Sequence, residues 1–438
     1  MHDIDSALRV IGARDTAAAR LANGLWGAMR AGAAHPRVTR YDVQGVCWGA
    51  LPLLARKPES AAIIGDRHQA ARILGELLDL LDYPRYADIC RGEVTREILD
   101  AAEDVDRCTE LTTEAWRDSG VQPPNTTLLT WGEVRGPVEQ AVHAATGRIL
   151  EEAIEDGLVD LRARNVEPIR EGLTLRILTS PAEELPGTWY SQIFDERLTT
   201  WLTFGGSQTR RELLVRIRPD VAKPPEFSTN YELPALEVLL EACADAGLRL
   251  TRNGYLPTSL VRDLVELTPA CADYPPSGRS ESAFPPLGNL RQLATELGLI
   301  KRIGNRLILT PAGHDRLSAP EQFVAAVGEA LVARDSSLRG VIQEVVFAVL
   351  LLETTVDLDR LLDKVAVVVG EEGWGPGTPG LSTEDLCRDF GMLFLRRLHI
   401  LDVLEVEDDG RRVGLTEAGV ATARWALRAR VMLREVTV

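Results

Sequence analysis

Side chains able to form hydrogen bonds with nucleic-acid bases gather around residue 290. Asn289, Arg291, Gln292 and Thr295 are spaced so that they share the outward face of one predicted helix. Arginine can donate two hydrogen bonds to guanine, glutamine can pair with adenine in the same two-pronged way, and threonine can contact a phosphate or a methyl group. These residue types at this spacing favour contact with DNA.

Basic residues follow this helix in a predicted hairpin and recur near the C-terminus. Lys301, Arg302, Asn305 and Arg306 flank the turn of the hairpin and suit phosphate or minor-groove contact. The second group has the same two parts, a helix with Arg396, Arg397 and His399 and a hairpin with Arg411 and Arg412. Acids crowd the second hairpin, namely Glu405, Glu407, Asp408 and Asp409. We therefore expect the first group to bind phosphate better than the second.

Residues for catalysis or metal binding do not form a recognisable motif. The six histidines show no HxH, HExxH or HxxxH spacing, and no GxSxG or GxGxxG segment opens a strand-to-helix turn. The six cysteines are scattered without metal-ligand spacing, so we expect them to be small buried apolar residues. The sequence predicts no enzyme, metal site or cofactor, although an active site assembled only in space stays an alternative.

The overall charge opposes DNA binding unless basic groups cluster. The chain has 438 residues and a formal net charge of −16, and an acidic body is repelled by a duplex. Its 45% hydrophobic and 26% charged residues are ordinary for a soluble globular protein. No apolar run is long enough to cross a membrane, and the N-terminus lacks the pattern of a signal peptide. We expect a cytoplasmic protein without membrane contact.

The stretch 287–317 predicts the elements that position the first basic group. Apolar residues at helical spacing over 287–297 predict a helix that Gly298 ends. Apolar runs flank Gly304-Asn305, a pair typical of a short hairpin turn. Thr310 can cap a following helix, with Pro311 at its first position. The stretch is therefore predicted to form a helix, a hairpin and a second helix.

Upstream residues complete a known order of elements. A helix over 233–247, a strand over 248–251 and a helix over 257–267 give the order helix, strand, helix, helix, hairpin, helix. This order resembles the winged helix-turn-helix superfamily. The resemblance implies that helix 287–297 is the recognition helix and the hairpin is the wing. The long loop 268–286 departs from the usual short turn between the two helices.

A second copy of this pattern is predicted at 357–438. Leu395-Arg396-Arg397-Leu398 corresponds to Leu290-Arg291-Gln292-Leu293, and the segment 413–419 corresponds to 307–313 at nearly the same distance. The glycine-rich stretch 373–380 is expected to be a flexible break within this copy. The closing helix over 417–434 carries Arg424, Arg428, Arg430 and Arg434, and long terminal helices of this kind often form homodimers.

The C-terminal half also resembles uncharacterised actinobacterial proteins, some of them associated with plasmids. They carry segments similar to Leu250–Pro257 (LTRNGYLP) and Asn305–Gly313 (NRLILTPAG) here. The scarcity of lysine beside abundant arginine fits the coding bias of a GC-rich bacterium. This resemblance implies no known activity.

The whole chain is predicted to be mainly α. We expect a helical domain at 1–165, a small strand-containing α+β segment at 166–230, a winged helix at 231–318, a helical spacer at 319–356 and a second winged helix at 357–438. Strands are expected at 173–178, 201–204 and 213–217, and Gly205–Arg211 is expected to form a hairpin turn rather than a phosphate site. An acidic run, Glu151 to Asp156, is expected to face solvent.

Three hypotheses about function follow. The first is a winged-helix protein that binds double-stranded DNA, as a regulator or as a mobile-element or plasmid-associated factor. The second is a winged-helix scaffold that contacts a protein partner or a second copy of the chain without contacting DNA. The third is an enzyme whose pocket the sequence does not reveal.

Overall fold

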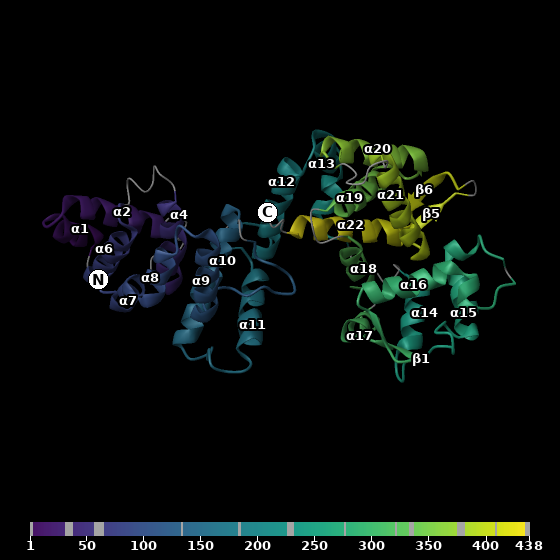
Figure 1. The fold of residues 1–438 in the computed structure, drawn as a ribbon, viewed down its shortest axis with the longest axis horizontal. Helices are drawn as coiled ribbons and strands as arrows, with labels where there is room; N and C mark the ends of the chain where they lie inside the picture. Colours follow the sequence, from purple (N-terminus) through teal and green to yellow (C-terminus); the bar gives the residue numbers. More distant parts are fainter. Residues whose placement is uncertain are drawn as a thin grey trace. The chain divides into compact units, whose positions relative to one another are not determined.

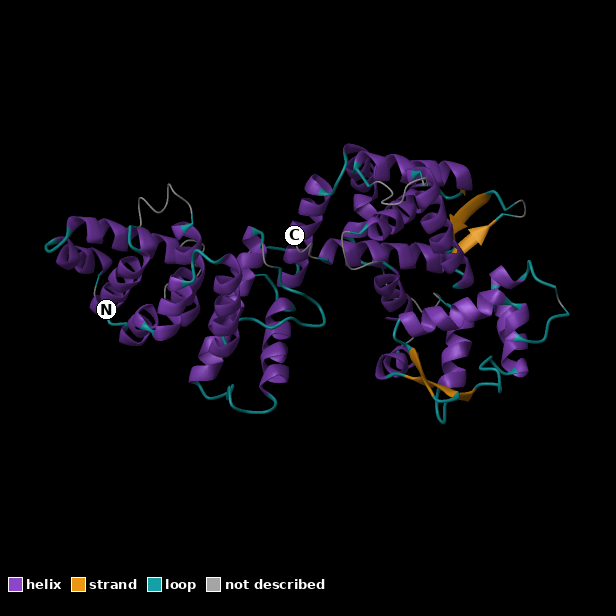
Figure 2. Cartoon of the chain, viewed as in Figure 1, coloured by secondary structure: helices purple, strands orange, loops and turns teal. Residues whose placement is uncertain are grey.

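The protein is seen in a computed structural model. It describes residues 3–30, 38–56, 65–132, 135–182, 185–225, 232–275, 277–319, 322–332, 337–374, 382–407 and 410–433. These residues are mainly helical, as predicted (Figure 2). The chain forms two compact units, Met1–Glu196 and Arg197–Val438. No helix among the described residues is long and apolar enough to cross a membrane.

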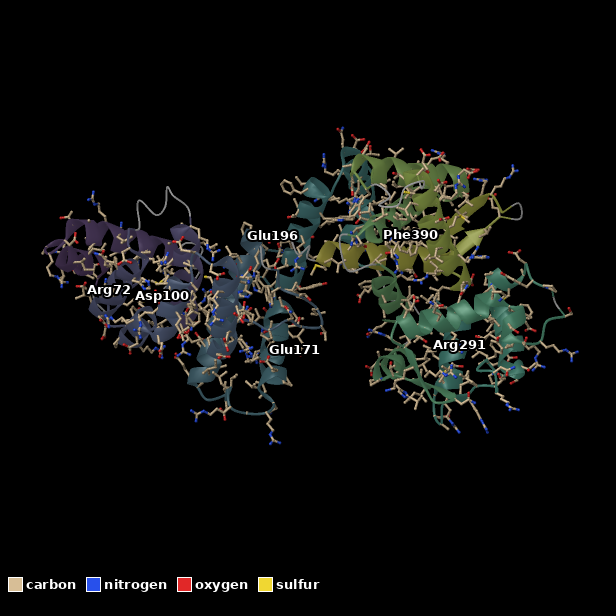
Figure 3. The ribbon with its side chains drawn as sticks, viewed as in Figure 1. Arg72, Asp100, Glu171, Glu196, Arg291 and Phe390 are labelled. Atoms are coloured by element: carbon tan, nitrogen blue, oxygen red, sulfur yellow. The ribbon has the colours of Figure 1, made fainter. Side chains whose placement is uncertain are left out.

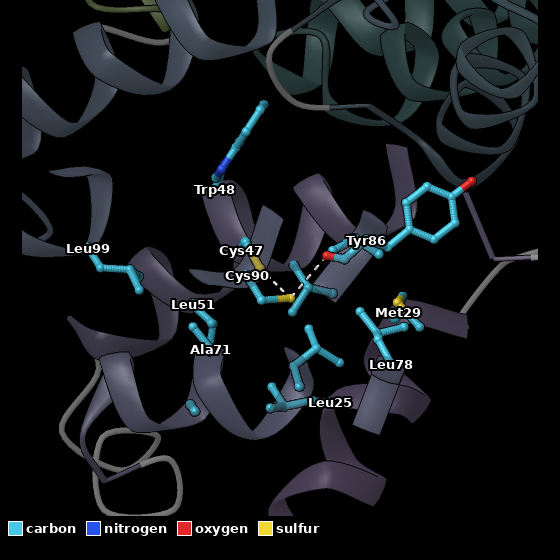
Figure 4. Packing of buried hydrophobic residues seen from close by; sticks show 14 of the residues in the cluster. Leu25, Met29, Cys47, Trp48, Leu51, Ala71, Leu78, Tyr86, Cys90 and Leu99 are labelled. Carbon is cyan, nitrogen blue, oxygen red and sulfur yellow. Dashed lines mark hydrogen bonds between the residues drawn. The ribbon is translucent and has the colours of Figure 1, made fainter. Parts of the chain in front are cut away.

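The described residues of unit 1 form helices and one isolated bridge, without a strand (Figure 1). They are α1 (Ile4–Gly12), α2 (Thr16–Arg30), α3 (Arg40–Gln44), the π-helix η1 (Gly45–Ala50), α4 (Leu51–Ala55), α6 (Arg67–Leu80), α7 (Pro84–Arg91), α8 (Glu93–Asp100), α9 (Val105–Ser119), α10 (Pro137–Glu155), α11 (Val166–Leu178) and the start of α12 (Trp189–Phe204). A buried cluster that includes Leu51, Leu74, Leu78 and Leu99 holds the N-terminal helices together (Figure 4).

The predicted strand-containing segment at 166–230 is wrong, because the described part of it is helical. Residues 173–178 end α11, residues 201–204 end α12, and residues 213–217 lie inside α13 (Gln208–Ala222). The short alternation at 173–178 misled the prediction. Over the longer helix, Arg170, Thr174 and Leu178 are buried at spacings of four residues, which is the period of a helix.

Residues 205–211 do not form the expected hairpin turn. Ser207 instead caps α13, accepting a hydrogen bond from the backbone N–H of Arg210 (3.3 Å). The backbone N–H of Ser207 donates to Glu372 (3.2 Å), and the Thr209 hydroxyl donates to Glu371 (2.6 Å). The chain's own carboxylates therefore occupy the place where an anion would bind this helix N-terminus.

Unit 2 contains two small sheets, each with the same strand order. The segment that contains the first sheet consists of α14 (Pro234–Cys243), β1 (Leu248–Arg249), α15 (Thr258–Leu267), η2 (Pro269–Cys271), η3 (Glu281–Ala283), α16 (Pro285–Glu296), β2 (Ile300–Ile303), β3 (Arg306–Leu309) and α17 (Pro311–Ser318). Strand β3 lies between β1 and β2 and is antiparallel to both. The helices and strands expected here thus occur in the expected order.

The second sheet repeats this arrangement. The segment that contains it consists of α18 (Phe323–Leu331), α19 (Leu338–Leu352), β4 (Val356–Asp357), α20 (Leu358–Glu371), α21 (Thr383–Ile400), β5 (Leu404–Val406), β6 (Arg412–Leu415) and α22 (Glu417–Met432). Strand β6 lies between β4 and β5, again antiparallel to both. Residues 375–380 of the expected break, and Asp408, Asp409 and Arg434, lie outside the described residues.

The two segments also share the joint after the hairpin. Thr310 and Thr416 each cap the following helix, accepting from the backbone N–H of Gly313 (3.1 Å) and Gly419 (3.0 Å). A Cβ on either glycine would collide with a backbone carbonyl of the preceding turn. The LTxAG pattern therefore has a physical cause, a threonine cap followed by a close backbone approach.

The residues at 319–356 are not merely a spacer. Helix α19 packs against α20, α21 and α22, and α18 packs along α22. Helix α19 is therefore part of the second helical cluster, where it occupies the position that α14 has in the first.

Helix α22 is largely buried within unit 2, and its described arginines contact groups of the same unit. Dimer formation through this helix stays a prediction. Arg424 pairs with Asp220 (2.5 Å), and Arg428 donates to the carbonyl of Val221 (2.6 Å). Arg430 reaches the fully buried carboxylate of Glu344 (3.2 Å). These arginines stabilise contacts between helices of the same unit.

Glu344 is also held by a two-pronged ion pair with Arg210. The Nε and Nη2 atoms of Arg210 lie 2.7 and 3.0 Å from the two oxygens of Glu344. Burial by itself would lower the pKa of Arg210, but the charges of Glu344 and Glu372 outweigh it and raise the pKa above its usual value. The ion pairs therefore link α13, α19 and α22.

Candidate nucleic-acid interface

The hairpin of β2 and β3, called hairpin 1 (residues 300–309), carries basic residues on its outer face. Arg249 of β1 pairs with Arg306 of β3, which in turn pairs with Ile303 of β2. Residues paired in this way point to the same side of a sheet, as does Lys301, two residues from Ile303. Arg249, Lys301 and Arg306 are all exposed, so three cations share one face.

Two further cations lie on and beside hairpin 1. Arg302 follows Lys301 in β2, so its side chain points to the opposite side of the strand. The guanidinium of Arg302 lies over Gly254, where φ is +79° and a Cβ would come within 3.5 Å of it. Its Nε donates to the carbonyl of Gly304 (3.0 Å), which fixes the base of the side chain. Arg252 is exposed in the same turn that contains Gly254.

These five residues, Arg249, Arg252, Lys301, Arg302 and Arg306, form what we call the basic cluster. Within the described part of the chain, no ion pair joins any of them to a carboxylate. Arg306 donates instead to the carbonyl of Ala246 (2.6 Å), and the Asn305 amide donates to Leu250 (2.9 Å). The hydrogen bonds orient the cluster while leaving its charge uncompensated.

Arg291 does not face outward as predicted. Its Nη2 lies 2.9 Å from Oε1 of Glu281, and its Nη1 donates to the carbonyl of Gly254 (3.0 Å). Glu281 is 3% exposed and also accepts from the backbone N–H of Leu256 (2.7 Å). Arg291 therefore pairs with a buried carboxylate and holds the 251–256 turn against α16. Figure 3 labels Arg291 on α16.

The other predicted residues of α16 are exposed. Asn289 faces solvent, the Gln292 amide donates to Glu296 (2.8 Å), and the Thr295 hydroxyl donates to the carbonyl of Arg291 (2.9 Å). Their positions agree with the helical spacing of the sequence. Only local hydrogen bonds would have to be exchanged if these side chains met a base or a phosphate.

Helix α16 also packs against α21, the helix that carries the second predicted set. Nη2 of Arg397 lies 2.9 Å from Oε2 of Glu296, and the Arg397 side chain is half-buried. The predicted outward position of Arg397 is therefore wrong, whereas Arg396 is exposed. Because α21 covers part of α16, the two helices would have to separate before α16 alone could enter a groove of DNA.

The second hairpin, called hairpin 2 (residues 404–415), is different in charge. Arg412 pairs with Glu407 on the facing strand (3.2 Å), and Glu405 is exposed nearby. Arg411 is exposed and also has an interaction partner. Hairpin 2 thus compensates its own cations, in line with the acids seen in its sequence.

Arg249 and Arg252 were missed by reasoning from the sequence. Arg249 belongs to β1 and Arg252 follows it, and a strand of two residues is too short to show an alternating pattern. Only the pairing of β1 with β3 brings them beside the hairpin. A weak signal existed, since both belong to the segment LRLTRN that directly follows the turn ending α14.

No group of three or more histidine, cysteine, aspartate or glutamate side chains with metal-binding geometry occurs among the described residues. Searches of family models, curated proteins and solved structures find no match to this chain. Function is therefore inferred from the side chains and their contacts alone.

Proposed function

We propose that unit 2 contains two winged helix-turn-helix modules and that the first of them binds double-stranded DNA. The shared order of elements, the shared strand order and the shared threonine caps support two modules. Since α19 occupies the place of α14, the second module begins at Leu338 rather than at residue 357. The first module extends from residue 232 to Ser318.

The basic cluster is the observation that carries the proposal. Five cations lie on and beside hairpin 1 without an acidic partner in the described residues, in a chain whose formal net charge is −16. Phosphate contacts supply most of the affinity of proteins for DNA, and they need uncompensated positive charge concentrated on one face. Hairpin 1 provides such a face, and hairpin 2 does not.

The mode of binding we propose is led by the hairpin. Helix α21 covers part of α16, and Arg291, the residue best suited to read guanine, is held by Glu281. Asn289 and Gln292 are left as base-contacting groups. Contacts to phosphates position a protein on DNA but carry no sequence information. We therefore expect affinity with little sequence preference, as suits a regulator or mobile-element factor that needs a further determinant for its target.

The test is fluorescence anisotropy of the full chain with a labelled duplex of mixed sequence, at several salt concentrations. If about four phosphates are neutralised, the logarithm of the binding constant should fall against the logarithm of salt with a slope near −3.6. A second duplex of different sequence should bind within a few-fold of the first. Absence of binding at low salt would contradict the proposal.

A scaffold function is the second candidate, and one observation favours it. Phe390 and Leu393 of α21 are 39% and 51% exposed and lie three residues apart, so they share a face of the helix (Figure 3). Exposed large apolar side chains that lie together can mark a protein interface. Under this hypothesis the chain is dimeric in light scattering and shows no salt-dependent affinity for DNA, and Phe390→Ser with Leu393→Ser makes it monomeric.

A further inference from the structure

Unit 1 contains a cavity of about 500 Å³ that the proposed DNA binding does not use. Residues of α3, η1, α7, α8 and α9 line it, so five elements of the same unit surround one space. Its apolar wall includes Trp48, Ile98, Leu111 and Ala115. Trp48 lies at the edge of the buried cluster in Figure 4. A cavity of this size suits a small organic molecule.

The polar groups of the wall leave one buried acceptor open. The Thr95 hydroxyl accepts from Trp48 Nε1 (2.9 Å) and donates to the Ile89 carbonyl (2.7 Å), and the Ser119 hydroxyl donates to Trp116 (2.7 Å). Gln44 lines the cavity, is 3% exposed, and its Oε1 has no hydrogen-bond partner among the described residues. A buried acceptor without a donor costs free energy, so a ligand N–H or O–H here would relieve that cost.

The charges around the cavity are mostly negative. Four carboxylates line it against one guanidinium, that of Arg40: Glu93, Glu97, Glu114 and Asp118. Glu114 and Asp118 share Arg117, at 3.5 and 3.2 Å. Glu93 and Glu97 are exposed at the start of α8 and have no ion-pair partner within the described ranges. The cavity therefore favours a cation over an anion.

The backbone beside Gln44 is unusual. The cavity residue Trp48 belongs to the π-helix η1, which directly follows Gln44 and joins α3 to α4 without interruption. π-helical turns are rare and often occur at functional sites. Gln44 and Trp48 are four residues apart along this continuous helical stretch, and both line the cavity.

We propose that this cavity binds a small organic cation, an amine with an apolar skeleton. The ammonium group faces Glu93 and Glu97, an N–H donates to Oε1 of Gln44, and the apolar part packs against Trp48. Unit 1 is then a ligand-binding unit. This site is independent of the proposed DNA contact, since every residue in it belongs to unit 1.

Three probes with the same phenyl group and a four-carbon chain, but with head groups of different charge, test the assignment. 4-Phenylbutylamine, 4-phenylbutanol and 4-phenylbutanoate are cationic, neutral and anionic at pH 7, and none absorbs where tryptophan fluoresces. Titration of the full chain, followed by tryptophan fluorescence and by saturation-transfer NMR, should show saturable one-to-one binding of the amine. The anion should bind at least tenfold more weakly. Equal binding of the amine and the anion would overturn the proposal.

Substitutions then test whether the amine binds in this cavity. Glu93→Gln with Glu97→Gln changes exposed residues only and should weaken the amine about five- to tenfold, with little effect on the alcohol. The matched control, Glu152→Gln with Asp156→Asn, removes the same charge from exposed positions of unit 1 outside the cavity and should leave amine affinity unchanged. Equal weakening by both pairs would mean attraction to the overall charge and would contradict the site.

A last variant tests the buried acceptor. Gln44→Met keeps a side chain of similar length without the amide, and should weaken the amine and the alcohol alike, since both donate a hydrogen bond. If Gln44→Met does not fold, the surface pair still decides the outcome. Binding of a lysine-rich amphipathic peptide without any binding of the small amine would overturn the assignment of the ligand class.

Discussion

Hairpin 1 and hairpin 2 occupy the same place in two sheets of the same strand order and have opposite surface chemistry. Each is the outer part of a three-stranded sheet with the same strand order, and each leads into a helix capped by threonine. In hairpin 1 the exposed arginines and the lysine lack acidic partners among the described residues, whereas in hairpin 2 Arg412 faces Glu407. The fold thus supports both surfaces, and only the side chains assign a function to one of them.

Corresponding residues of the two helices before the hairpins diverge in the same way. The sequence alignment pairs Arg291 with Arg396, yet Arg291 is held by buried Glu281 and Arg396 is exposed. The left-handed residues that follow the two helices, Gly298 and Asp402, set a register one residue shorter, in which Arg396 takes the place of Gln292. A matched sequence position therefore does not guarantee a matched role. Four predictions compare the first half of unit 2 (residues 232–318) with its second half (residues 338–433).

The largest effect is expected from Arg291→Ala. Removing the guanidinium leaves the carboxylate of Glu281 buried without its partner, which should cost about 3 kcal/mol of unfolding free energy. Arg396→Ala removes the exposed arginine that the sequence alignment pairs with Arg291, and should cost less than about 0.5 kcal/mol. Urea unfolding of both variants measures the difference, and equal losses would contradict the structural role of Arg291.

The next effect is on DNA affinity. Arg302→Glu should reduce the affinity for duplex at moderate salt by about tenfold or more, because it removes one uncompensated cation and adds a repelling charge. Arg412→Glu makes the same change in hairpin 2, where acids already surround it, and should reduce affinity less than about twofold. Anisotropy titrations under identical conditions compare them. A larger loss of DNA affinity for Arg412→Glu than for Arg302→Glu would show that hairpin 2, and not hairpin 1, contacts the DNA.

Asp402 offers a smaller comparison. It occupies the place of Gly298 and has φ of +59°, against +71° for the glycine, a region that costs a residue with a Cβ about 1 kcal/mol. Burial raises the pKa of Asp402 above its usual value, because the charged form is poorly solvated there. Asp402→Gly should therefore stabilise the protein by about 1 kcal/mol at pH 7.

The pH dependence of that gain has a definite sign. Because the pKa of Asp402 is higher in the folded state than in the unfolded state, the folded state binds more protons near pH 4, and acid favours folding at this residue. The advantage of the glycine variant should therefore shrink as pH falls through this range. Thermal unfolding at pH 7 and pH 4 measures it, and Gly298→Asp should destabilise the first half at both pH values. An advantage that grew in acid would contradict the assignment.

The smallest effect is expected from neutralising hairpin 2. Glu405→Gln with Glu407→Gln frees Arg412 from its ion pair and should raise DNA affinity about two- to threefold at low salt. The control for net charge is Glu152→Gln with Asp156→Asn, which removes two charges from unit 1. Its DNA affinity is measured in the same way. An equal rise in both variants would show that overall charge, and not hairpin 2, sets the change.

Helices and hairpins with strong local signals could be predicted from the sequence. The turn at Gly304-Asn305, the cap at Thr310 and the apolar face of α16 are set by neighbours within a few residues. The strand predicted at 173–178 failed because six alternating residues cannot outweigh a longer helical period. Glu151, predicted to face solvent, is buried because Tyr86 and the backbone of Arg40 donate to it from distant parts of the chain.

The candidate site was predictable only in part for the same reason. Hairpin 1 and its lysine and arginines follow from local sequence, but the partner of Arg291 lies ten residues away across a loop, and Arg249 joins the cluster through strand pairing. The cavity of unit 1 gave no signal at all, because its wall comes from five elements. Long-range contacts decide which arginines are compensated, and sequence spacing does not record them.

The salt dependence of DNA binding for the wild type and for the Lys301→Ala, Arg302→Ala variant tests the central claim most directly. Each lost phosphate contact should reduce the steepness of the log–log slope by about 0.9, so the slope should change from about −3.6 to about −1.8. The Arg411→Ala, Arg412→Ala variant should keep the wild-type slope. A slope unchanged by the hairpin 1 substitutions would contradict the assignment of DNA binding to the basic cluster.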